Sequence, residues 1–315
     1  MIPRRLYAAA ASHVPGELVA VLAKVLVGDC ADLLNRDQLE TAGVERPVSL
    51  TFLDPPFNQG KDYEHFDDAM SGHDYWAWME RICARAYELT TEGGAIYFMQ
   101  REKNAEYVLR SIRETGWTFE NLIIWTKRTS AVPGPRRFGK QYQIIAFGTK
   151  GKRAGTFHRL RIDAPLPPGY RQPRSNGVFV TDCWDDIREL TSGYFAGDEA
   201  LRLPDGERFH KQQAPLALLV RIILSSTDPG GLVLDPFAGT GTTLVAAEQL
   251  GRPSVGVEID PKNAAMIEHR VRTAREADSI VPLRAYYRFT KDLDSIWPSA
   301  SAPWTVKGEQ MALID

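Results

Sequence analysis

The chain has 315 residues, of which 43% are hydrophobic and 25% charged, and its net charge is −2. This length suits one large domain or two ordinary ones, and the composition excludes full disorder. Three distant cysteines without a CxxC pair, and six histidines without HxxxH or HExxH spacing, argue against a disulfide framework and against a bound metal. No apolar run approaches the roughly 18 residues of a membrane span, so we expect a protein of the reducing cytoplasm.

Charge is unevenly distributed along the chain. The window from Thr126 to Arg174 holds twelve basic residues and one acid, Asp163, so it carries +11 while the rest of the chain carries −13. A local field of that size attracts polyanions even on a nearly neutral protein. The window therefore indicates a nucleic-acid partner, and a solvated basic face is the alternative.

Short apolar strands alternate with helical stretches. Strands are predicted at Val48–Leu53, Ala95–Met99, Phe119–Trp125, Gln143–Phe147, Leu232–Leu234 and Ser254–Ile259. Helices are predicted at His73–Thr90, Glu102–Glu114, Pro215–Ser226, Thr242–Leu250 and Pro261–Ala274. The alternation predicts an α/β fold, in which a doubly wound, mostly parallel sheet is covered on both faces. The four prolines of Ala164–Arg174 predict a loop-rich insert, and the pattern fades after about Asp278.

The second half of the chain carries a glycine-rich loop. Asp235–Thr243, DPFAGTGTT, follows a predicted strand and opens a predicted helix. Its glycines let the backbone approach a ligand, and the helix N-terminus offers free N–H groups. Glu258 closes the next strand, where an acid can accept the hydroxyls of a ribose. This order of elements predicts a nucleotide-type cofactor, with a tight turn beside a surface acid as the alternative.

Two positions favour S-adenosylmethionine as that cofactor. Leu244 stands where a dinucleotide fingerprint requires Gly or Ala, and the Gly-Lys-Ser/Thr of a phosphate-binding loop is absent. Asp235 at the strand end suits a ligand that bears an ammonium group better than a pyrophosphate, because like charges repel. NAD and ATP are therefore disfavoured.

The first half carries Asp54-Pro55-Pro56-Phe57 at the carboxyl end of a strand, where open α/β sheets bind ligands. An exocyclic base amine is a poor nucleophile, because its lone pair is delocalised into the ring. A carboxylate and a backbone carbonyl can accept its two N–H bonds and direct the lone pair towards an incoming methyl group. The prolines stiffen the turn, and Phe57 offers a flat face to a flipped base. Alone, such a tetrad is more often a rigid turn than a functional site.

Together these motifs resemble those of the beta group of DNA N6-adenine and N4-cytosine methyltransferases, over roughly Val25–Arg275. Asp54–Phe57 resembles their DPPY/DPPF tetrad, which precedes the cofactor loop in this circularly permuted group. Gly28-Asp29-Cys30 resembles the segment whose acid contacts the cofactor adenine. His210–Leu219 resembles the helix entry at the methionine end of the cofactor, although Ala214 replaces a frequent lysine.

The resemblance implies a role for each matched residue. Asp54 would accept a hydrogen bond from the target amine, the Pro55 carbonyl would be the second acceptor, Pro56 would stiffen the turn and Phe57 would stack on the base. The implied S-adenosylmethionine ligands are Asp29, Cys30, Asp235, Pro236, Phe237, Gly239, Thr240, Gly241, Thr242 and Glu258. The expected phosphate contacts, which read no sequence, are Arg136, Arg137 and Lys140.

The same resemblance implies a division of the chain. We expect an N-terminal arm (1–24), a catalytic half (25–126), a target-recognition insert (127–208), a cofactor-binding half (209–277) and a tail (278–315). The expected partner is double-stranded DNA, at the nucleoid. A homodimer and a separate restriction endonuclease are further alternatives. Tyr286, Tyr287 and Trp297 would either support such a dimer or pack back on the core.

Other functions fit less well. Methylation at cytosine C5 needs a nucleophilic cysteine, usually after proline, and no cysteine here follows proline. RNA base methyltransferases usually place the cofactor loop first, and a silent DNA-binding protein would be expected to have lost Asp54 or the glycines. Asp54 favours adenine N6 over cytosine N4, because N4 enzymes more often carry Ser there. We therefore predict methyl transfer to the N6 amine of a flipped adenine, by a restriction–modification or orphan methylase.

Overall fold

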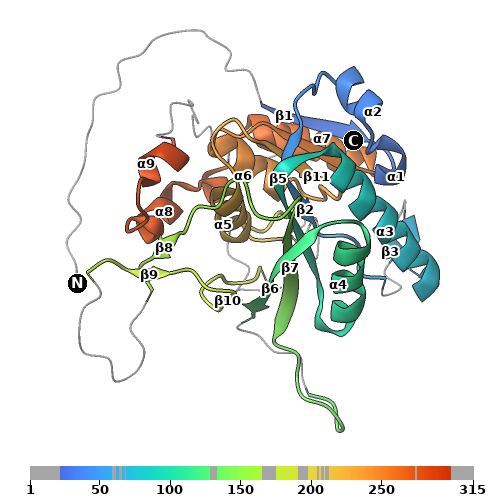
Figure 1. Ribbon diagram of the computed structural model, residues 1–315, viewed down its shortest axis with the longest axis horizontal. Coiled ribbons are helices and arrows are strands. Elements are labelled where there is room, and N and C mark those ends of the chain that lie inside the picture. The colour runs from blue at the N-terminus through green and yellow to red at the C-terminus, as the bar shows by residue number, and fades with distance from the viewer. Residues whose placement is uncertain are drawn as a thin grey trace.

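The computed structural model describes residues 22–58, 69–127, 133–164, 175–190, 198–203 and 213–298 except 274, together with 62–63, 66–67, 206 and 209. Eight strands form one sheet in the order β1-β12-β11-β2-β5-β7-β6-β10 (Figure 1). They are β1 (Ala23–Val27), β2 (Val48–Leu53), β5 (Thr90–Arg101), β6 (Thr118–Thr126), β7 (Tyr142–Thr149), β10 (Cys183–Trp184), β11 (Leu232–Asp235) and β12 (Ser254–Glu258). Neighbours are parallel, except that β7 lies antiparallel between β5 and β6. The predicted mostly parallel sheet is thus confirmed.

Helices cover both faces of this sheet. One face packs against α1 (Cys30–Leu33), α2 (Arg36–Thr41), α3 (Gly72–Leu89) and α4 (Ala105–Glu114). The other packs against α5 (Leu216–Ser226), α6 (Thr242–Gln249), α7 (Pro261–Arg272), α8 (Val281–Arg284) and α9 (Leu293–Ile296). Because side chains alternate along a strand, Ile96 and Phe98 of β5 face the first layer, and Tyr97 and Met99 face the second. Both faces are buried, which explains the nearly continuous apolar strands.

The remaining strands are short pairs outside the main sheet. β3 (Asp62–Tyr63) pairs with β4 (Phe66–Asp67), and β8 (Arg161–Ile162) pairs with β9 (Val178–Phe179). In the part of the chain that is described, no helix is both long enough and apolar enough to cross a bilayer.

The segment 127–208, expected to be a recognition insert, also contributes to the sheet. Its strand β7 lies in the interior of the sheet and pairs with both β5 and β6. Most of the predicted loop Ala164–Arg174 lies outside the described residues. The periodicity also missed β1, in which Lys24 interrupts the apolar run. The Lys24 ammonium donates to the backbone carbonyls of Ala42 and Gly43, in the turn that follows α2.

The predicted tail contains aromatic residues that pack on the core. Tyr287 and Trp297 are buried in the cluster formed with α5 and α6, 6.1 Å apart between ring centroids. The buried Arg252 guanidinium donates to the carbonyls of Thr227 and Ile296. These contacts attach the segment to the core. Of the two expected roles for Tyr287 and Trp297, dimer contact or packing on the core, the structure shows packing on the core.

Replacing Trp297 with alanine should lower the free energy of unfolding by about 3 kcal/mol, because it empties a well-packed aromatic site. Urea unfolding followed by circular dichroism measures this. Val281→Ala, at a 61% exposed position on α8, is the control and should stay within about 0.5 kcal/mol of the wild type. A Trp297→Ala protein of unchanged stability would contradict this packing.

Candidate active site

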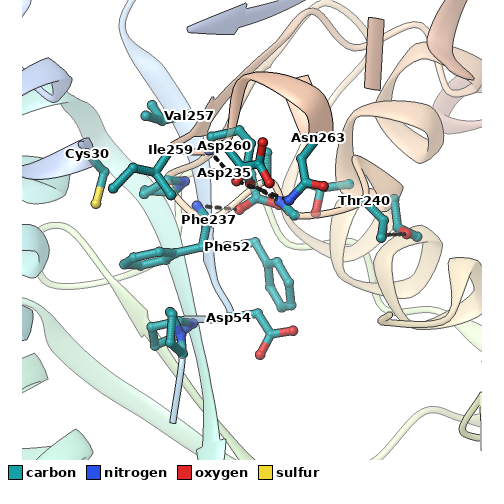
Figure 2. Close-up of a pocket in the computed structure, with 18 of the residues that line it drawn as sticks. Cys30, Phe52, Asp54, Asp235, Phe237, Thr240, Val257, Ile259, Asp260 and Asn263 are labelled. Atoms are coloured by element: carbon teal, nitrogen blue, oxygen red, sulfur yellow. Dashed lines mark hydrogen bonds between the residues drawn. The ribbon is translucent and has the colours of Figure 1, made fainter. Parts of the chain in front are cut away.

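The two sequence motifs meet because β2 and β11 are neighbours. These strands run parallel, with Thr51 beside Leu234, so Asp54 and Asp235 leave the sheet at the same edge. A pocket opens there (Figure 2). Of the predicted site residues, its wall contains Asp29, Cys30, Asp54, Pro55, Pro56, Asp235, Pro236, Phe237, Gly239, Thr240, Thr242 and Glu258. Figure 2 shows Asp235 and Asn263 towards one end of the pocket and Asp54 at the other.

The cofactor loop is organised by two carboxylates. Asp235 accepts the N–H of Phe237 at 3.0 Å. Glu258 accepts the N–H of Gly239 at 2.8 Å and that of Asp260 at 3.0 Å, with a longer contact from Asn263. A carboxylate has about four lone-pair sites, so Glu258 retains capacity for a ligand hydroxyl.

The two glycines of the loop are required for different reasons, one facing open space and the other a packed side chain. Both have positive φ, +53° at Gly239 and +72° at Gly241. A Cβ on Gly239 would approach only the Phe237 carbonyl, at 3.7 Å, so this part of the wall is open to a ligand. A Cβ on Gly241 would lie 2.6 Å from the Ile267 side chain. Gly241 therefore permits α6 to pack on α7, and it lies outside the pocket wall.

Buried negative charge marks the loop. Burial raises the pKa of Asp235 to about 6, against hydrogen bonds from Phe237 and Thr243 that lower it. Burial also raises the pKa of Glu258. The backbone groups that donate to these carboxylates are neutral, so a ligand with an ammonium group and ribose hydroxyls matches the acceptors. Cys30 has its thiol pKa raised by burial as well, which makes it an apolar wall residue.

The rest of the wall is largely apolar and was not predicted. It includes Phe52, Val257 and Ile259, together with Trp78 of α3, whose ring meets that of Phe237 edge-on at 5.5 Å. Such surfaces suit the planar base of a nucleoside. Trp78 has the helical spacing of a core residue, and no local signal distinguishes it. Ala214, at the frequent lysine position of the family, also lines the pocket.

Hydrogen bonds hold the turn of the catalytic tetrad. The Tyr75 hydroxyl donates to the Pro56 carbonyl at 2.7 Å, and Gln100 donates to the same hydroxyl at 3.0 Å. With the Pro56 carbonyl engaged, the carbonyl of Pro55 suits the role of second acceptor. The Phe57 side chain is only 5% exposed and lies outside the pocket wall, so its stacking on a base stays a prediction.

A buried ion pair supports the cofactor loop from behind. The Arg270 guanidinium donates to the Thr240 carbonyl at 2.6 Å and to the Thr242 hydroxyl at 3.2 Å. Asp278 binds Arg270 at 2.6 Å and is also bound by Arg275 at 2.7 Å. On a sequence, Arg270 looks like a surface residue of a helix, so this support was missed.

The expected phosphate contacts lie away from the pocket wall. Arg136 and Arg137 are exposed on the connection from β6 to β7. Lys140 on the same connection forms an ion pair with Glu102, which follows β5 directly. The Lys140 ammonium therefore already has a protein partner, whereas a phosphate contact was expected to be unpaired. Its binding to DNA stays a prediction.

Comparison with known proteins identifies the family of the chain. Residues 48–269 match the N6/N4 family of DNA methylases. The chain belongs to this family. The predicted enzyme class, a DNA methyltransferase of N6-adenine or N4-cytosine type, is therefore confirmed. The predicted cofactor, S-adenosylmethionine, is the methyl donor of that class and is present in solved structures of the same fold.

Named relatives belong to the same class of enzyme, and solved structures share the fold. DNA adenine methyltransferase YhdJ of Escherichia coli is 29% identical over 238 residues, 72% of this chain and 77% of its own length. Type II methyltransferase M.BamHI of Bacillus amyloliquefaciens is 28% identical over 80% of this chain and 57% of its own length. The PvuII cytosine-N4-specific DNA methyltransferase has a TM-score of 0.56 at 18% identity, with 87% of this methylase and 93% of that chain covered.

The fold is also that of M1.HpyAVI, whose structure contains S-adenosylmethionine. Its TM-score is 0.52 at 20% identity, and the similarity covers 79% of this chain and 98% of that one. At such identities the two solved structures establish the shared fold.

The raised pKa of Asp235 predicts a pH effect on the stability of this methylase. Between about pH 4 and pH 6 the unfolded chain releases a proton that the folded protein retains. The free energy of unfolding of the wild type therefore falls as pH rises through that window. Asp235→Asn lacks the titrating group, so its free energy of unfolding should fall by up to ~3 kcal/mol less over the same range. Urea unfolding between pH 4 and pH 7 measures it. Asp37→Asn, at an exposed position on α2, is the control, and parallel curves for the wild type and Asp235→Asn would contradict the assignment.

Proposed function

We propose that this methylase transfers a methyl group from S-adenosylmethionine to the N6 amine of an adenine flipped out of double-stranded DNA. The observation that carries the proposal is the single pocket to which the ends of β2 and β11 contribute Asp54 and Asp235. When bound, S-adenosylmethionine supplies an electrophilic methyl group. The chain supplies acceptors for the target amine at one end of the pocket and acceptors for the cofactor at the other.

Each group has a distinct task in this proposal. The Asp54 carboxylate and the Pro55 carbonyl accept the two N–H bonds of the amine, which stabilises the positive charge that develops on nitrogen. The Asp235 carboxylate faces the ammonium group of the cofactor, and Glu258 binds its ribose. Tyr75 keeps the tetrad turn in position through its bond to Pro56.

Adenine is proposed over cytosine on two grounds. The tetrad begins with Asp54, and the relative YhdJ, at 29% identity, is named a DNA adenine methyltransferase. Cytosine N4 presents a similar amine to the same acceptors and is the alternative target. The proposed partner is double-stranded DNA, at the nucleoid of the cytoplasm. A second copy of the chain and a separate restriction endonuclease are further proposed partners.

Incubation with isotopically labelled S-adenosylmethionine and unmethylated DNA tests the reaction directly. Digestion to nucleosides and mass spectrometry should yield labelled N6-methyladenine. Labelled N4-methylcytosine would correct the target base within the same family. Label on RNA, or none on DNA, would overturn the proposed reaction.

Asp54→Ala should reduce methyl transfer by at least ~100-fold, because the acceptor of the amine is lost. Calorimetric titration should still show S-adenosylmethionine binding within a few-fold of the wild type, since the cofactor carboxylates remain. Asp37→Ala is a matched control for loss of a carboxylate and should retain activity. Loss of cofactor binding in Asp54→Ala would show that the roles are wrongly assigned.

The double variant Arg136→Ala/Arg137→Ala should bind DNA more weakly and with a flatter salt dependence. Each lost phosphate contact lowers the slope of log affinity against log salt by about 0.9. Fluorescence anisotropy with a labelled duplex at several salt concentrations measures the slope. Arg110→Ala/Arg113→Ala on α4 removes the same charge elsewhere and should leave it unchanged. An unaltered slope in the first variant would place the DNA-binding face elsewhere.

A further inference from the structure

The Phe138 side chain is almost fully exposed to solvent. It is 96% exposed, whereas the other exposed large hydrophobic residues of the described chain reach at most 61%. Arg136 and Arg137 precede it directly and are exposed as well. A flat apolar ring beside two cations is a combination that suits a nucleic acid, whose bases offer stacking surfaces between phosphates.

The fold places this ring at the edge of the sheet where the active site opens. In one row of the sheet Arg101 of β5 pairs with Gln143 of β7, which pairs with Trp125 of β6. Because β7 is antiparallel to both, β5 and β6 end at the edge where β2 ends. Neighbouring strands lie about 4.8 Å apart, and β7 and β6 are two and three strands away from β2, so the base of the connection lies roughly 10–15 Å across the sheet from the tetrad.

The base of the connection is fixed to the body. The Lys127 N–H donates to the Gln141 carbonyl at 2.7 Å, and the Lys127 ammonium lies 5.1 Å from the centre of the Trp125 ring. Lys140 is anchored by its ion pair with Glu102. From this base, residues 133–141 project beyond the ends of β6 and β7, clear of the helical layers (Figure 1). The ring is thus carried outward from a fixed support.

We propose that Phe138 is a wedge that enters the base stack of DNA beside the target base, while Arg136 and Arg137 bind the flanking phosphates. The inference rests on the proposed function, because a base that leaves the duplex for the pocket opens a gap in the stack. An inserted ring fills such a gap and recovers part of the lost stacking. Phe138 is therefore a positioning residue, distinct from the groups that touch the reacting amine.

The test uses duplexes built on the site that the wild-type protein methylates, with 2-aminopurine in place of the target adenine. The wild type should raise the fluorescence on binding, because the base leaves the stack. Phe138→Ala should lose most of this rise and methylate the natural duplex at least ~10-fold more slowly. Its affinity for S-adenosylmethionine should not change. Phe138→Trp, which keeps a flat ring, should restore both signals.

A mismatch at the target base separates a wedge from a structural role. The mismatched base is already loosened, so Phe138→Ala should approach the wild-type rate on that duplex, whereas a misfolded variant would stay slow on both. Phe119→Ala, at a 45% exposed position near the opposite end of β6, is the matched control and should behave as the wild type. Equal fluorescence and rates for Phe138→Ala and the wild type would overturn the wedge alone. A wild type that modifies no DNA would overturn the proposed function as well.

Discussion

The parallel pairing of β2 with β11 is the contact on which the active site depends. The residues that follow these strands, Asp54 and Asp235, are far apart in the sequence, and the motifs share a pocket only because the strands are neighbours. The register also matters, since side chains alternate between the two faces of a sheet. A slip of one residue would turn the apolar side chains of β2 to the wrong layers and move Asp54 relative to the cofactor loop.

Two kinds of buried charge lie near this edge, and they do different work. Arg270 and Asp278 neutralise each other, and the pair secures the loop through Thr240 and Thr242. Asp235 and Glu258 instead accept backbone N–H groups and retain raised pKa values. Charged groups held in this way destabilise the free protein, so their presence in a pocket indicates a ligand that complements them. The neutralised pair supports the loop, and the two carboxylates are the acceptors that we propose for the cofactor.

The sequence was most informative where structure is local. The apolar run Val48–Leu53 and the helical spacing of His73–Thr90 correspond closely to β2 and α3. Most residues of the two motifs line one pocket, whereas Phe57 and Gly241 lie outside its wall. Contacts between distant residues were not predictable. Arg270 and Trp78 have the spacing of ordinary helix residues, and only the packed structure brings them to the loop. Gly241 is the opposite case. Its motif predicts contact with a ligand, whereas in the structure a Cβ at this position would clash with the Ile267 side chain.

Within the eight-stranded sheet, the antiparallel strand β7 explains how the proposed DNA contacts and the pocket share one edge. A parallel strand in the place of β7 would need a crossover connection, usually a helix across one face of the sheet. Because β7 returns antiparallel, β6 joins it by a direct connection at the edge where β2, β5 and β11 end. The exposed side chains of that connection, Arg136 and Phe138, can therefore project past the sheet without covering the pocket. The strand order thus places the exposed residues that we propose for DNA contact a few strand widths from the largely apolar pocket.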